Sequence, residues 1–141
     1  MKKVFYLAQE HGDKTKCGGF GDAAVAMGEG MRTLDDVDFA FVMPGTQVFL
    51  DHVKFEDNIA ERIAQHKKSP EKQGIAIYEG QTPSGVKTHV VLSQPILECE
   101  GMIYNPKNGL FSPEGYKIAD SMVQASLTLA KNEVNTPTIL H

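Results

Sequence analysis

The stretch KCGGFGD (Lys16–Asp22) lies between a continuous apolar run, Val4–Ala8, and a helical pattern over Ala23–Leu34. A buried strand that leads into a glycine-rich turn and then a helix presents backbone N–H groups at the positive end of the helix dipole. Such a turn binds anions, and Lys16 adds a positive charge to it. Glycine-rich turns also occur for conformational reasons alone. The stretch therefore predicts a strand–helix unit joined either by a ligand-binding loop or by a tight turn.

Three apolar runs predict the core of one sheet: Val4–Ala8, Val37–Met43 and Val86–Leu92. Val4–Ala8 is apolar without alternation, which is typical of a central strand that is buried on both faces of a parallel sheet. Helical patterns over Ala23–Leu34 and Glu114–Asn132 alternate with these runs. The order predicts an α/β fold with a Rossmann-like parallel-core sheet and helices on both faces.

The two helical patterns define buried stripes. The expected stripe of the first helix is Ala24, Met27, Met31 and Leu34, and that of the second is Ile118, Met122, Ala125 and Leu129. Asp22 is placed to cap the first helix. Gly28 and Gly30 weaken that helix, and we expect both to allow close contact with a neighbouring element.

Other segments give less definite patterns. Ile75–Tyr78 is expected to pair antiparallel with Val86–Leu92, and Thr136–His141 to open another buried strand. Earlier in the chain, Gln47–Lys72 stays open: Val48–Leu50 and Val53–Phe55 could be short strands, whereas a narrow apolar stripe at Ile59, Ala60, Ile63 and Ala64 favours a helix.

Composition excludes several classes of protein. The chain has 141 residues, 41% hydrophobic and 23% charged, with a net charge of −4, which predicts one globular domain. Scattered basic residues argue against a nucleic-acid partner. No segment approaches the roughly 20 apolar residues that span a bilayer, so we expect no membrane role. In the absence of a signal-peptide pattern we expect a cytoplasmic protein.

The histidines and cysteines predict no metal site. Cys17 and Cys99 lie far apart without paired spacing, so neither a disulfide framework nor a zinc site is indicated. The histidines at positions 11, 52, 66 and 89 show no metal-ligand spacing, and we expect structural roles for them.

The segment around the glycine-rich stretch resembles the N-terminal signature of bacterial glycogen synthases and plant starch synthases. Glu10 is followed six positions later by Lys16 and then by Gly18-Gly19-Phe20-Gly21-Asp22 without a gap, as in that family. Cys17 stands where the family usually has threonine. The resemblance covers about twenty residues well.

The resemblance implies that the loop faces the donor, ADP-glucose or UDP-glucose, in the cleft of a two-domain glucosyltransferase that extends an α-glucan. Lys16 and the amides of Gly18 and Gly19 would contact the donor, and Glu10 and Asp22 would support the loop or touch the acceptor. The turn-rich segment Glu98–Phe111, with Tyr104, is a candidate cleft wall, because loops after parallel strands form the crevice of open α/β sheets. Catalytic residues stay unassigned, and no cofactor is expected.

The chain also departs from the family. Ser93 and Gln94 stand where the family has an aspartate, and Tyr116 and Lys117 keep only part of a later signature. The later histidine-rich and catalytic motifs are absent. Residues 1–141 are therefore expected to form a single, truncated N-terminal domain that is inactive alone and tends to self-associate through the cut sheet edge. The alternative is a stand-alone α/β module that binds a sugar nucleotide or another phosphorylated ligand without catalysis.

Overall fold

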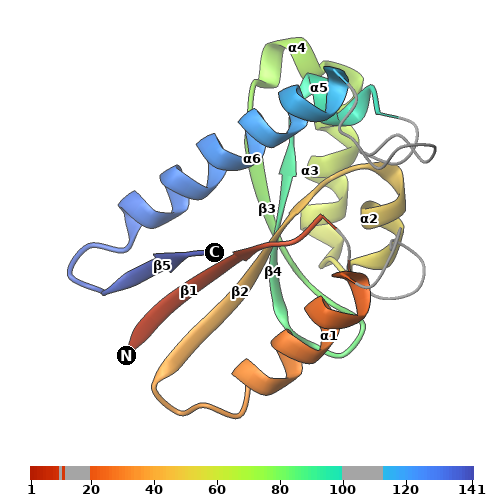
Figure 1. Ribbon diagram of the computed structural model, residues 1–141. Helices are drawn as coiled ribbons and strands as arrows, with labels where there is room; N and C mark the ends of the chain where they lie inside the picture. Colours follow the sequence, from red (N-terminus) through yellow and green to blue (C-terminus); the bar gives the residue numbers. More distant parts are fainter. Residues whose placement is uncertain (10, 12–19, 100–112) are drawn as a thin grey trace.

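The computed structural model describes residues 1–9, 11, 20–99 and 113–141 (Figure 1). Their elements follow in chain order: β1 (Lys2–Leu7), α1 (Phe20–Met31), β2 (Val37–Pro44), α2 (Gln47–His52), α3 (Asp57–Lys68), α4 (Pro70–Gln73), β3 (Ala76–Gln81), β4 (Lys87–Leu92), α5 (Gln94–Leu97), α6 (Pro113–Asn132) and β5 (Thr138–Leu140).

The described strands form one sheet in the order β3-β4-β2-β1-β5. β1 lies inside the sheet and pairs in parallel with both β2 and β5, and β2 pairs in parallel with β4. Only β3, at one edge, runs antiparallel to its neighbour β4 among the described strands. The predicted α/β fold with a Rossmann-like parallel core is confirmed, and so is the antiparallel pairing of the segment after Ile75.

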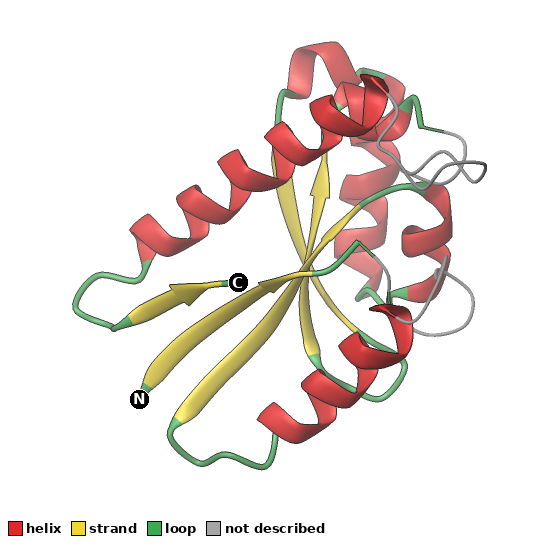
Figure 2. Cartoon of the chain, in the orientation of Figure 1, coloured by secondary structure: helices red, strands yellow, loops and turns green. Residues whose placement is uncertain are grey.

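Helices cover both faces of the sheet, which gives three layers (Figure 2). On one face, α1 and α2 pack over Val4, Phe39, Phe41 and Val90. On the other, α5 and α6 pack over Phe5, Ala40, Val42 and Val91. Alternate residues of β1 and β2 thus serve opposite layers, because neighbouring side chains of a strand point to opposite faces.

The buried stripe of α1 differs from the prediction. Met27 and Leu34 are 39% and 47% exposed, while Ala24 is buried and Met31 packs against the core. The side of α1 that faces the sheet includes Gly28 in place of Met27. A Cβ added at Gly28 would lie 2.7 Å from the Phe41 ring. The expected close contact is therefore correct for Gly28. It is wrong for Gly30, which has no atom within 4 Å of such a Cβ. By contrast, α6 buries the stripe predicted for it.

Gln47–Lys72, which the sequence left unassigned, is mostly helical. Val48–Leu50 lies in α2 and not in a strand, because Phe49 packs into the core from a helix. Near Val53–Phe55 the structure has one isolated bridge, Lys54 with Gln81. The helix expected around Ile63 is confirmed as α3.

The last predicted strand forms, but it is not buried. β5 pairs with β1 through Ile139 and Leu140, opposite Val4 and Phe5. Ile139 and Leu140 are 52% and 40% exposed, because β5 is the edge strand on that side.

Candidate functional site

The carboxyl ends of the parallel strands meet at one edge of the sheet. From β1 the chain moves through β2 to β4 on one side, and α6 then returns it to β5 on the other side of β1. In open α/β sheets, ligands bind outside the carboxyl ends of strands where the strand order reverses in this way. The end of β1, beside β5, is therefore the first place to look for a site.

The segment that leaves this end of β1 carries most of the predicted site. β1 ends at Leu7 and α1 begins at Phe20, so the expected order of strand, connecting segment and helix is confirmed. Asp22 is exposed in the first turn of α1, where a carboxylate is favourable to the helix dipole, rather than before the helix as a cap. The remaining predicted site residues lie outside the described residues: Glu10, Lys16, Gly18, Gly19 and Tyr104.

A histidine pair lies at the same edge. His11, just after β1, is buried, and its Nδ1 lies 2.8 Å from Nε2 of His52 at the end of α2. The His11 ring also makes an edge contact with Phe41. Burial first, and the charge of His52 second, lower the pKa of His11 to about 4. His11 is thus neutral at pH 7 and links the start of the segment after β1 to α2.

Sequence reasoning missed this pair. It noted only that the histidines lack metal-ligand spacing, and 41 positions separate the two residues. No local pattern signals a contact that depends on the parallel pairing of β1 with β2. Within the described part of the chain, no group of three or more His, Cys, Asp or Glu side chains could hold a metal ion.

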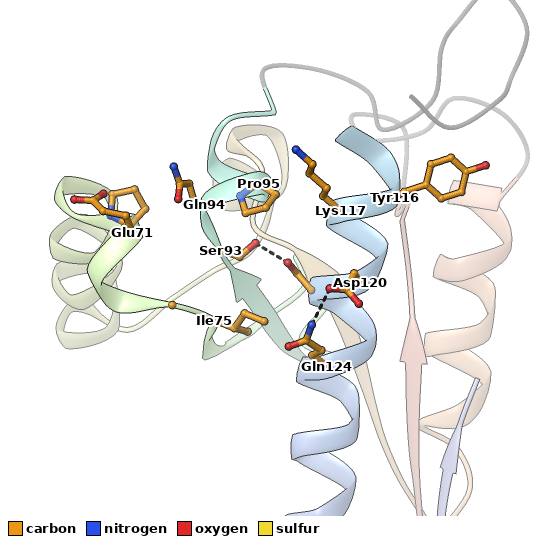
Figure 3. A pocket seen from close by; sticks show the side chains of 12 residues that line it. Glu71, Ile75, Ser93, Gln94, Pro95, Tyr116, Lys117, Asp120 and Gln124 are labelled. Carbon is orange, nitrogen blue, oxygen red and sulfur yellow. Dashed lines mark hydrogen bonds between the residues drawn. The ribbon is translucent and has the colours of Figure 1, made fainter. Parts of the chain in front are cut away.

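A pocket of about 490 Å³ opens beside the carboxyl end of β4 (Figure 3). It lies between α4, α5 and the first turns of α6. The residues that line it are Pro70, Glu71, Gly74, Ile75, Ser93, Gln94, Pro95, Tyr116, Lys117, Asp120, Ser121 and Gln124. The structure thus brings together Ser93 and Gln94 with Tyr116 and Lys117, the two places where the sequence departs from the family signature.

Polar contacts fix the floor of this pocket. The hydroxyls of Ser93 and Ser121, both buried, lie 2.9 Å apart and join the end of β4 to α6. Gln124 Nε2 donates to Asp120 Oδ2 at 2.7 Å (Figure 3). Lys117 is the cation of the lining, whereas Tyr116 points away from the pocket in Figure 3. Amides, hydroxyls, one cation and the carboxylates of Glu71 and Asp120 give a surface that can hydrogen-bond a polar ligand.

None of the helices in the described ranges is both long enough and apolar enough to cross a membrane.

Comparison with known proteins gives one informative similarity. The chain is similar to a glycogen synthase of Pseudomonas fluorescens, with 28% identity over 115 residues. The match covers 82% of this chain and 21% of that relative, so the chain spans about a fifth of the length of the curated relative it matches. No family model and no solved structure matches. The similarity is to the same family that the residues around Lys16 resemble.

Proposed function

We propose that this chain is the N-terminal, acceptor-side part of a glucosyltransferase of the glycogen and starch synthase type. The observation that carries the proposal is the position of the signature stretch: it joins the carboxyl end of an internal parallel strand to a helix, at the reversal of strand order. The similarity to a glycogen synthase supports the same assignment. The donor is ADP-glucose or UDP-glucose, the acceptor is an α-glucan, and the protein works in the cytoplasm.

In this proposal the segment after β1 binds the diphosphate of the donor. Departure of a nucleoside diphosphate requires stabilisation of negative charge, which cationic side chains and backbone N–H groups supply. Lys16 and the amides of Gly18 and Gly19 have that role. Glu10 and Asp22 support the segment or touch the acceptor, and Tyr104 forms part of the cleft wall.

The test is to measure the binding of ADP-glucose and UDP-glucose to this chain through the changes that they cause in its amide chemical shifts. A charge-assisted contact contributes about 1.5–3 kcal/mol, so Lys16→Ala is expected to weaken donor binding at least tenfold. Gly19→Val is expected to abolish it, since a β-branched residue cannot let the backbone approach the phosphates.

Lys68→Ala is the matched control, because Lys68 is an exposed lysine at the end of α3. It should leave donor binding unchanged. If Lys16→Ala binds both nucleotides as well as the unchanged chain does, the segment is a tight turn and the proposed function fails.

A further inference from the structure

The apolar side of helix α6 is wider than the part of it that packs on the sheet. Ile118, Met122 and Ala125 are buried against β1, β2 and β4. A second stripe, Ala119, Val123, Leu127 and Ala130, follows at spacings of four, four and three residues, which places its members along one side of a helix. We refer to these residues as the outer stripe.

Val123 and Leu127 are the exposed members of the outer stripe, whereas Ala119 and Ala130 are partly buried. Val123 and Leu127 are 50% and 47% exposed, and α6 runs across one face of the sheet (Figure 2). Single exposed apolar residues are ordinary on protein surfaces. The side of α6 opposite the core carries the usual polar residues, among them Lys117, Asp120 and Gln124, and the outer stripe lies on the flank between that side and the buried face. Val123 and Leu127, one helical turn apart on this flank, form an exposed apolar surface that a second helix could cover.

Two opposite charges border the outer stripe on the same flank. Asp120 and Lys131 are eleven residues apart, which is about three helical turns, so both lie along one edge of the stripe. Both are exposed. The acid is near the beginning of the stripe and the base is at its end. In an antiparallel arrangement of two identical helices, the beginning of one stripe meets the end of the other.

We propose that the outer stripe binds the outer stripe of a second copy of this chain, with the two α6 helices antiparallel about a twofold axis near Ala125. Val123 of each copy then lies level with Leu127 of the other. Asp120 of each copy lies one residue from the level of Lys131 of the other, so the same two charges form two symmetric ion pairs. A twofold contact requires this kind of self-complementarity. The proposal does not depend on the proposed function.

The contact is small. One short helix face buries less than the roughly 1,200 Å² typical of stable complexes, so we expect dissociation constants weaker than about 1 μM. The association is therefore measured by sedimentation equilibrium at high micromolar concentrations and low salt, where exposed ion pairs are least screened.

Charge reversal tests the register of the pairing. Asp120→Lys and Lys131→Asp should each weaken the dimer at least about tenfold, because each places like charges together twice. The double variant Asp120→Lys with Lys131→Asp should recover the original affinity. Glu61→Lys makes the same charge change at an exposed position of α3 and is the control. It should leave the affinity of the dimer unchanged. Circular dichroism establishes that each variant is folded.

Further variants separate this face from the edge of the sheet. Val123→Glu should leave a folded monomer, whereas Ile139→Lys on β5 should still dimerise. A chain that is monomeric at every concentration overturns the proposal. So does a dimer that survives Val123→Glu, one that is not restored in the double charge variant, or one that Ile139→Lys breaks.

Discussion

Buried and partly buried histidines make the stability of this protein depend on pH. Burial lowers the pKa of His66 and His89 as well as that of His11. For His11 the folded value of about 4 lies below the ordinary value of 6.5. Between these values the unfolded chain binds a proton that the folded chain does not, so stability falls as the pH drops. Above pH 6.5 neither state is protonated at this residue, and its contribution is constant.

We predict that the free energy of unfolding rises between pH 4 and 6.5 and then levels. His11 alone supplies at most about 3 kcal/mol of this rise. Urea denaturation at several pH values measures it, and His11→Gln should flatten the profile because glutamine does not titrate. His141→Gln, at an exposed histidine, is the control that should keep the slope. An unchanged slope in His11→Gln would show that other groups cause the dependence.

One buried lysine shows why the sequence could not predict every side chain. Lys3 is 5% exposed within β1, where its ammonium pairs with Asp38 and lies 3.7 Å from Glu133. Burial tends to raise the pKa of Asp38, but the hydrogen bond and charge of Lys3 lower it overall. A lysine beside an apolar run indicates the exposed start of a strand, and only the pairing of β1 with β2 supplies the partner that permits its burial.

At the scale of elements, periodicity predicted best where one face of an element packs on the sheet. The core strands and α6 follow their patterns closely. The pattern left α2 undecided, since Val48–Leu50 is too short an apolar run to distinguish a strand from one turn of helix. The predicted burial of β5 was wrong, because apolar character does not show which strand is at the edge.

The two glycines of α1 give a matched test of this packing. Gly28→Ala should destabilise the protein by about 1–3 kcal/mol, because the new Cβ would lie 2.7 Å from the buried Phe41 ring. Gly30→Ala meets no atom within 4 Å and should stabilise by up to about 1 kcal/mol through helix propensity. Thermal and urea denaturation compare the two. Equal effects of the same sign would contradict the placement of α1 on the sheet.

At the scale of the whole molecule, the sheet order gives the candidate site its position. The sequence predicted that β1 is central and that a segment rich in glycine follows it. It could not predict the reversal of strand order at β1, since that depends on where α6 returns the chain. It also could not predict that residues 93, 94, 116 and 117 meet in one pocket, because the meeting requires both the end of β4 and the packing of α6 across it.

The activity of this chain is the prediction that concerns the whole molecule. Transfer of glucose requires a donor and an acceptor held together with water excluded. The match to the glycogen synthase accounts for 21% of that protein, and the proposed role of this chain is one side of a cleft. We therefore expect no glucosyl transfer from ADP-glucose or UDP-glucose to glycogen by the purified 141-residue chain.

Radiolabelled donor and glycogen measure this transfer, with a complete glycogen synthase as the positive control. Donor binding is measured in the same preparation, so that an inactive chain is distinguished from an unfolded one. Binding without transfer agrees with one side of a glucosyltransferase cleft. Transfer above background that Lys16→Ala abolishes would mean that this chain holds both substrates by itself. The requirement for a second domain would then be wrong, but the assignment of the segment after β1 as the donor-binding segment would stand.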